Sequence, residues 1–134
     1  IQEKYCRILD LTNETVFVCG STRSGEEKLL SGVYNRLQKQ MAADLLWIIA
    51  PRHLNRLADV QELLEGSGLK YDLLSSCRGQ GRQHDIVLVD SMGELAELYS
   101  VGDYIFCGGS LVDKGGHNIM EPIRLQRPVY FGPF

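Results

Sequence analysis

A glycine-rich loop followed by a helix start is the part of this sequence best suited to bind a ligand. Two glycine pairs, Gly108-Gly109 and Gly115-Gly116, flank a short loop, and Asn118, Glu121 and Pro122 then open a predicted helix. Glycine lets a backbone run close to a ligand because it has no side chain. A helix start offers free N–H groups and a partial positive charge, which favour a phosphate. A carboxylate at Glu121 would be placed to accept hydrogen bonds from both hydroxyls of a ribose, so the pattern favours a nucleotide pocket.

Length, charge and cysteine usage limit the possible functions. The 134 residues are enough for one domain with a buried core. A formal charge of -3, from 14 basic and 17 acidic residues, argues against a nucleic-acid partner. No apolar run is long enough to span a bilayer. The cysteines lack CxxC spacing, so we expect a reducing compartment with neither disulfides nor a metal site.

Apolar runs alternate with helical patterns along the chain. Strands are predicted at 15–19, 45–50, 86–89, 104–107 and 129–131, with a weaker one at 71–74. Helices are predicted at 26–41, 54–64, 93–99 and after Pro122, and a polar loop or hairpin tip at 75–84. Strands that are apolar on both faces belong in a parallel sheet covered by helices on each side. The order predicts an α/β fold with a doubly wound, mostly parallel, Rossmann-like sheet over residues 15–134. Residues 1–14 are interpreted as a linker or the end of a preceding helix.

Unusual residues gather at the predicted carboxyl ends of the strands, where such sheets bind their ligands. These segments are Gly20-Ser21-Thr22, Pro51-Arg52-His53, Ser91-Met92-Gly93-Glu94 and the loop from Gly108. The guanidinium of Arg52 can pair with a phosphate or lie against a base. Met92 and Gly93 offer a soft apolar side chain and a bare backbone to a flat base. Each feature alone has an ordinary structural explanation, such as a surface arginine or a helix cap, but together at one edge they favour a binding site.

Other kinds of chemistry have weaker support. The histidines lack metal-site spacing, and we expect His53 and His117 to orient loops or contact phosphate. Ser21 and Ser110 lack the strand-to-helix elbow of a hydrolase nucleophile. The segment 20–25 is not a dinucleotide-binding fingerprint, which weighs against a dehydrogenase.

Four motifs, in this order, resemble those of the bacterial 3-deoxy-D-manno-octulosonic acid (Kdo) transferases. They are Gly20-Ser21-Thr22-Arg23-Ser24-Gly25-Glu26-Glu27, Ala50-Pro51-Arg52-His53, Asp90-Ser91-Met92-Gly93-Glu94-Leu95, and the segment from Gly108 through Gly115-Gly116-His117-Asn118-Ile119-Met120-Glu121-Pro122. The resemblance runs from about Thr15 to Phe134. It implies the C-terminal half of a GT-B glycosyltransferase, its donor-binding domain, truncated at the C-terminal end. Arg23 stands where the family would have His, and Ile119-Met120 where it would have Pro-Leu.

The resemblance implies an enzyme that transfers Kdo from CMP-Kdo to a lipid A precursor in lipopolysaccharide biosynthesis. It implies work at the cytoplasmic face of the bacterial inner membrane, without a metal or other cofactor. The donor contacts carried over from the family are Pro51, Arg52, Met92, Gly93, Glu94, Asn118, Ile119, Met120 and Glu121. No catalytic residue is assigned to this chain, because the family's carboxylate base, acceptor site and membrane contact belong to an N-terminal domain. The chain by itself is therefore expected to be soluble and inactive.

Two alternatives remain open. One is the donor domain of another GT-B transferase, or a nucleotide-sugar epimerase, that uses UDP in place of CMP. The other is a non-catalytic, flavodoxin-like regulatory domain. Such a domain usually has acidic residues after its early strands, where this chain has Gly20 and Pro51, so only Asp90 supports it.

Overall fold

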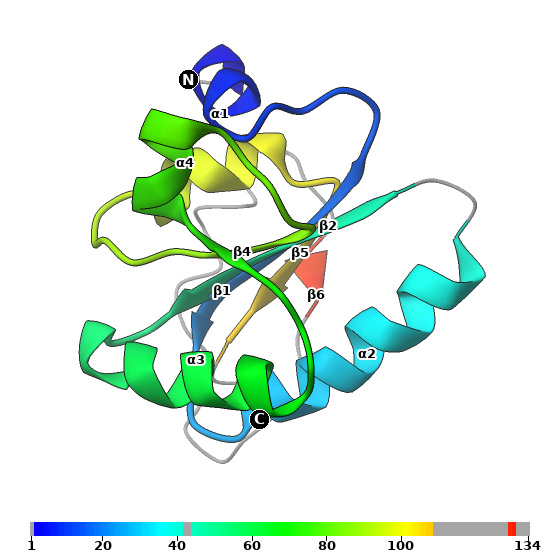
Figure 1. Cartoon of the computed structure of the whole chain (residues 1–134), viewed down its shortest axis with the longest axis vertical. Helices are drawn as coiled ribbons and strands as arrows, with labels where there is room; N and C mark the ends of the chain where they lie inside the picture. The colour runs from blue at the N-terminus through cyan, green and yellow to red at the C-terminus, as the bar shows by residue number, and fades with distance from the viewer. Residues whose placement is uncertain (1, 42–43, 109–128, 131–134) are drawn as a thin grey trace.

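A six-stranded parallel sheet forms the centre of the computed structural model, which describes residues 2–41, 44–108 and 129–130 (Figure 1). The strand order is β3-β4-β2-β1-β5-β6, and each neighbouring pair is parallel. The strands are β1 (Thr15–Thr22), β2 (Leu45–Pro51), β3 (Asp72–Leu73), β4 (Ile86–Leu88), β5 (Tyr104–Cys107) and β6 (Val129–Tyr130). The six predicted strands are thus confirmed, with small shifts at their ends.

Helices cover both faces of the sheet (Figure 1). One face carries α2 (Glu26–Gln40), η1 (Leu54–Arg56) and α3 (Leu57–Gly66). The opposite face carries α1 (Gln2–Ile8), α4 (Leu74–Gln80), α5 (Leu95–Leu98) and η2 (Tyr99–Val101). This arrangement confirms the predicted doubly wound α/β fold.

Two hydrophobic clusters, one on each face, hold the helices to the sheet. Side chains alternate along a strand, so Val16 and Val18 pack toward α1, α4 and α5. Phe17 and Cys19 pack toward α2 and α3 on the other face. Every residue of β2 is buried, as expected of a strand with helices on both sides.

The segment at 75–84 differs from its predicted structure. A loop or hairpin tip was expected, but residues 74–80 form α4, and the prediction is wrong there. Leu74 and Cys77, three residues apart, turn to one side of this helix and are buried against the sheet. One pair of apolar residues in a short segment that also contains Gly79 is too weak a periodic pattern to predict a helix from sequence.

The first residues of the chain pack into the core of the sheet. Tyr5 of α1 and Leu9 just after it are fully buried in the same cluster as β1 and β2. The Nε of Arg82 donates a hydrogen bond to the Leu9 carbonyl at 2.7 Å, which ties this segment to the loop before β4. The residues interpreted as a linker or the end of a helix therefore contain a helix that contributes to this core.

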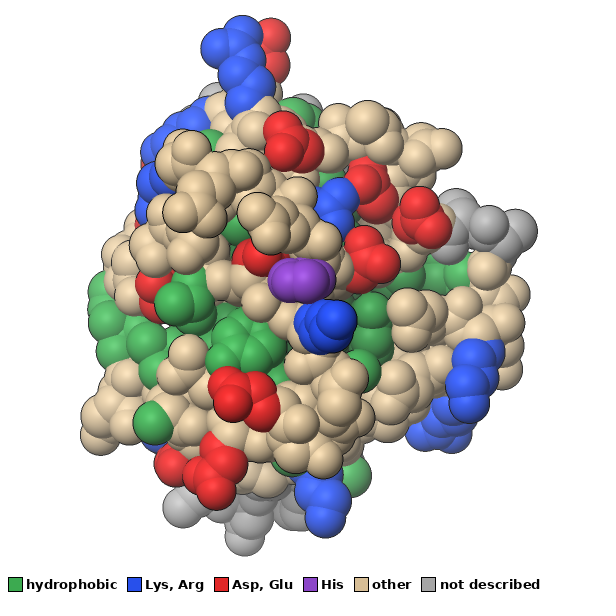
Figure 2. Space-filling view, viewed as in Figure 1, with side chains coloured by type: hydrophobic (Ala, Val, Ile, Leu, Met, Phe, Trp, Pro, Cys, Tyr) green, Lys and Arg blue, Asp and Glu red, His purple; other side chains and the backbone are tan. Residues whose placement is uncertain are grey.

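The surface in Figure 2 carries acidic and basic side chains interspersed, with hydrophobic side chains mainly in a band across the middle. On this face the described residues form no extended basic area of the kind that binds nucleic acid. Among the described residues, no helix combines the length and the hydropathy needed to cross a membrane. The predicted helix after Pro122 and the loop beyond Gly108 lie outside the described residues.

Candidate nucleotide-binding site

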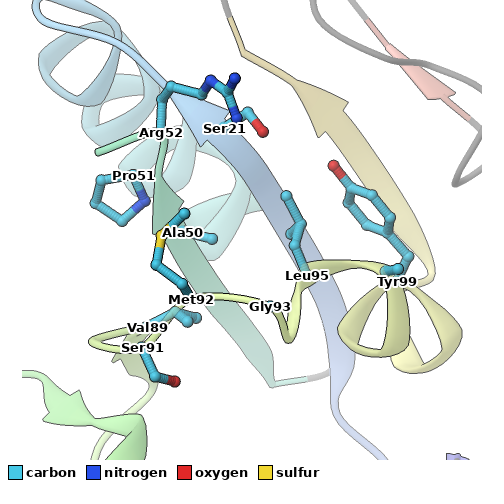
Figure 3. Close-up of a pocket in the computed structure, with 11 residues that line it drawn as sticks. Ser21, Ala50, Pro51, Arg52, Val89, Ser91, Met92, Gly93, Leu95 and Tyr99 are labelled. Carbon is cyan, nitrogen blue, oxygen red and sulfur yellow. The ribbon is translucent and has the colours of Figure 1, made fainter. Parts of the chain in front are cut away.

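A pocket of about 280 Å³ lies at the carboxyl ends of β1, β2 and β4 (Figure 3). β2 leads to α3 on one face of the sheet, whereas its neighbour β4 leads to α5 on the other. The two connections diverge and leave a crevice, which is the usual ligand position in doubly wound sheets. The pocket is lined by Ser21, Ala50, Pro51, Arg52, Val89, Ser91, Met92, Gly93, Leu95, Ala96 and Tyr99. Four of the predicted donor contacts, Pro51, Arg52, Met92 and Gly93, thus line one pocket.

Arg52 supplies a positive charge at the rim of this pocket. Its side chain is exposed and extends over the end of β1 beside Ser21 (Figure 3). It forms no ion pair with any carboxylate in the described part of the chain. Other arginines do have carboxylate partners, namely Arg56, Arg78 and Arg82. The guanidinium of Arg52 is therefore available to pair with an anionic ligand.

The loop that carries Arg52 is fixed on both sides. Pro51 is buried, and the Arg52 backbone N–H donates to the Thr22 carbonyl at 2.9 Å. Beyond the loop, the Arg56 guanidinium binds the Glu27 carboxylate through two hydrogen bonds, at 2.8 and 3.0 Å. The hydrogen bonds with Glu27 raise the pKa of Arg56, as expected of a guanidinium stabilised by a carboxylate. A loop held in this way presents the Arg52 guanidinium at a defined place.

Met92 and Gly93 form the opposite wall. The Met92 side chain is 61% exposed, which is unusual for a large apolar group, and it lies near Ala50 (Figure 3). Gly93 has a φ of 85°, a conformation that residues with a Cβ rarely adopt. An exposed thioether and a bare backbone in the same pocket as Arg52 provide a surface for a flat ring within reach of an anion site.

Glu94 has contacts that the sequence did not predict. Its carboxylate accepts a hydrogen bond from the Tyr5 hydroxyl at 2.9 Å, and also bonds with Arg78 and Ser91. Burial and the neighbouring Glu97 carboxylate, which accepts a second hydrogen bond from the Tyr5 hydroxyl at 3.3 Å, raise the pKa of Tyr5. Glu94 does not line the pocket, so the structure assigns its carboxylate to holding the loop before α5 against α1 and α4. Its predicted contact with the donor stays a prediction.

Seven residues of the pocket lining were not predicted as donor contacts, although two of them, Ser21 and Ser91, lie in segments that the sequence placed at this edge. The seven are Ser21, Ala50, Val89, Ser91, Leu95, Ala96 and Tyr99. Leu95, Ala96 and Tyr99 come from α5 and η2, and the spacing of Leu95 and Tyr99 places both on one helix face. A Cβ on Gly20 would lie 2.2 Å from the Tyr99 hydroxyl oxygen. The glycine at position 20, inside a strand, is the sequence feature that could have indicated a close approach of another group to the end of β1.

The predicted contacts Asn118, Ile119, Met120 and Glu121 lie outside the described residues, and their role stays a prediction. Gly108 begins this loop and is described. A Cβ on Gly108 would lie 2.2 Å from the Ser21 carbonyl oxygen. Glycine at this position therefore allows the backbones at 108 and at Ser21 to pass close to each other. Among the residues that the structure describes, no group of three His, Cys, Asp or Glu side chains is placed to hold a metal.

Comparisons with known proteins place the chain in a family, although no family model matches it. A bifunctional glycosyltransferase/methyltransferase of Fusobacterium nucleatum is 39% identical over 136 residues, covering 99% of this chain and 20% of that protein. A 3-deoxy-D-manno-octulosonic acid transferase of Chlamydophila psittaci is 35% identical over 127 residues, covering 93% of this chain and 28% of that protein. The crystal structure of the C-terminal CMP-Kdo binding domain of WaaA from Acinetobacter baumannii matches with a TM-score of 0.83 and 32% identity. The chain belongs to the Kdo transferase family.

The chain corresponds to one part of a Kdo transferase. It spans 20% and 28% of the lengths of the two relatives named above. The structural match covers 96% of this chain and 66% of the solved one, which is a C-terminal domain. The predicted resemblance to the Kdo transferases, and to their C-terminal domain, is thus confirmed.

Proposed function

We propose that this chain is the donor-binding domain of a glycosyltransferase that transfers Kdo from CMP-Kdo to a lipid A precursor in lipopolysaccharide biosynthesis. The observation that carries the proposal is the Arg52 guanidinium, which has no carboxylate partner among the described residues and lines a pocket at the diverging strands. Support comes from the solved relative, a CMP-Kdo binding domain that matches nearly the whole chain.

The pocket has the chemistry that a CMP-sugar needs. Such a donor carries one negative charge on its phosphodiester, and Kdo adds a carboxylate. The Arg52 guanidinium suits the phosphate, and Met92 with Gly93 suits the flat cytosine. We assign Asn118 to Glu121 to the ribose and the neighbouring phosphate oxygens, by resemblance to the family. One phosphate charge can be met by a guanidinium and backbone N–H groups, so we propose a site that works without a metal or other cofactor.

Transfer breaks the bond between the Kdo carbon and the phosphate oxygen, and CMP departs with the electron pair. Negative charge then grows on the phosphate, where a fixed Arg52 would stabilise it. We assign the general base, the lipid acceptor site and the membrane contact to an N-terminal domain, with the reaction at the cytoplasmic face of the bacterial inner membrane. On this account residues 1–134 bind the donor nucleotide but do not transfer sugar alone.

The regulatory-domain alternative has less support from the geometry. The Asp90 carboxylate accepts hydrogen bonds from the Ser75 hydroxyl at 2.5 Å and from the Ser75 backbone N–H at 3.1 Å. Both of its oxygens are used at the start of α4, and Asp90 does not line the pocket. Asp90 therefore caps a helix, which is an ordinary structural role.

Calorimetric titration of the chain with CMP and with UDP tests the proposal. We expect CMP to bind more tightly than UDP. Arg52→Ala should weaken CMP binding by about tenfold or more, the cost of a lost hydrogen bond to a charged group. Arg36→Ala is the matched control, since Arg36 is an exposed arginine of α2 that does not line the pocket. Tighter binding of UDP would favour the UDP alternative, and equal affinity of the Arg52 and Arg36 variants for CMP would contradict the assigned site.

A further inference from the structure

Ser21 is the pocket residue with the most unusual backbone. Its φ is 55°, and within the described part of the chain the only other non-glycine residue with a positive φ is Asp10. A side chain with a Cβ is disfavoured in this left-handed region. Such a conformation persists only where the surrounding structure enforces it, and it is concentrated at functional sites.

Neighbouring segments enforce the conformation of Ser21. In the pairing of β1 with β2, Gly20 lies opposite Ala50 and Thr22 lies opposite Pro51, so Ser21 is an extra residue in a β-bulge. A bulge turns a side chain away from the direction that a regular strand would give it. The Gly20 backbone meets the Tyr99 hydroxyl on one side, and Gly108 packs against the Ser21 carbonyl on the other.

The bulge places the Ser21 side chain in the pocket. Figure 3 shows it beside the guanidinium of Arg52, although the two residues end different strands. Within the described residues, the Ser21 hydroxyl has no hydrogen-bond partner in the structure, and the guanidinium has no carboxylate partner. A neutral O–H donor next to a positive charge is an arrangement that binds an anionic oxygen.

We propose that the Ser21 hydroxyl donates a hydrogen bond to a phosphate oxygen of the donor nucleotide, and that the strained bulge exists to present it. This inference rests on the proposed function, since the nucleotide supplies the phosphate. It adds a second side-chain contact from β1 to the contact from Arg52. It also accounts for a residue other than glycine at a position where the backbone favours glycine.

Three variants of the chain test this inference with CMP and cytidine as ligands. Ser21→Ala removes the hydroxyl and should weaken CMP binding by about tenfold or more, as for other hydrogen bonds to charged groups. Cytidine lacks the phosphate, so its affinity should not change. Ser21→Gly removes the hydroxyl and also the backbone strain, so this variant should melt at a higher temperature while binding CMP as weakly as Ser21→Ala. Ser24→Ala, an exposed serine three residues away that does not line the pocket, is the control.

The outcomes separate this inference from the proposed function. If wild-type chain binds CMP and Arg52→Ala weakens it, but both Ser21 variants keep wild-type affinity, this inference alone is overturned. If wild-type chain does not bind CMP at all, the proposed function fails and this inference fails with it. A Ser21→Gly variant that melts higher with unchanged CMP affinity would show a structural role only.

Discussion

The guanidinium of Arg56 and the carboxylate of Glu27 form a two-point ion pair, with N–O distances of 2.8 and 3.0 Å. Their side chains are 18% and 3% exposed, so the pair is largely buried. It joins the start of α2 to η1, and Arg52 lies only a few residues before η1. The position of the proposed phosphate contact therefore depends on a pair that does not line the pocket.

Glu27→Ala should weaken both the fold and the site. Removing the Glu27 carboxylate leaves the largely buried charge of Arg56 without its partner. Breaking a buried ion pair in this way costs about 3–5 kcal/mol, and we expect a loss of about 3 kcal/mol because Arg56 keeps some exposure. Urea denaturation measures this loss, and calorimetry should show weaker CMP binding because the Arg52 loop is less fixed. The control Glu62→Ala removes an exposed glutamate of α3 and should stay within about 0.5 kcal/mol of wild type. A Glu27→Ala variant as stable as this control would contradict the role of the pair.

Glu94 offers a test that separates positioning from direct binding. Glu94→Ala removes the nearer of two acceptors of the buried Tyr5 hydroxyl, which then keeps only the Glu97 carboxylate at 3.3 Å, and it also removes the partner of Arg78. We therefore expect a loss of about 1 kcal/mol in stability, the lower end for a lost acceptor, and weaker CMP binding. Glu94→Gln keeps an acceptor for Tyr5 and should bind CMP nearly as well as wild type. Loss of CMP affinity in Glu94→Gln without loss of stability would instead support the direct donor contact that the sequence predicted.

Two glycines at the end of α4 should respond in opposite ways to the same change. Gly79 lies inside the helix with open space around it, so Gly79→Ala should stabilise the chain by up to about 1 kcal/mol. Gly81 has a φ of 77°, and a Cβ there would lie 2.7 Å from a carboxylate oxygen of Asp10, so Gly81→Ala should destabilise it by about 1–2 kcal/mol. Thermal unfolding of the two variants measures both effects. Equal shifts in melting temperature would contradict the helix that replaces the predicted loop.

Acid should weaken the fold through Glu14. Burial alone would raise the pKa of the Glu14 carboxyl, but hydrogen bonds from the Thr12 backbone and the charge of Arg82 outweigh it and hold the pKa below its ordinary value of 4.5. Because the unfolded chain then takes up the proton first, this stabilisation is complete above pH 4.5 and is lost as the pH falls through the lowered pKa. Urea midpoints measured across this range should fall less steeply in Glu14→Gln than in wild type. Identical acid profiles would contradict a lowered pKa of Glu14 in the folded chain.

The sheet was predictable because its strands are continuous apolar runs. Leu45–Pro51 is buried along its whole length, and only a parallel strand covered on both faces explains such a run. The convergence of Arg52 with Met92 and Gly93 was predictable for a related reason, since parallel strands bring their carboxyl ends to one edge.

Contacts between distant segments were not predictable. The hydrogen bond from Tyr5 to Glu94 joins residues 89 apart in sequence, and no local pattern indicates which helix lies beside that loop. The positive φ of Ser21 likewise depends on how β1 pairs with β2 and how Gly108 packs against it. The glycines at positions 20 and 108 indicated that some group comes close to the backbone there. They did not indicate that the group is Tyr99 at Gly20 and the Ser21 carbonyl at Gly108.

An amide chemical-shift titration of the chain with CMP tests the central claim most directly, since it reports which loops meet the nucleotide. We expect saturable shifts at Arg52 and Gly93 together, because both line the pocket at the ends of β2 and β4. Amides of α2 and α3 that face away from the pocket should stay in place. Saturating CMP that moves neither Arg52 nor Gly93, or that moves only residues of α2 and α3, would contradict the account.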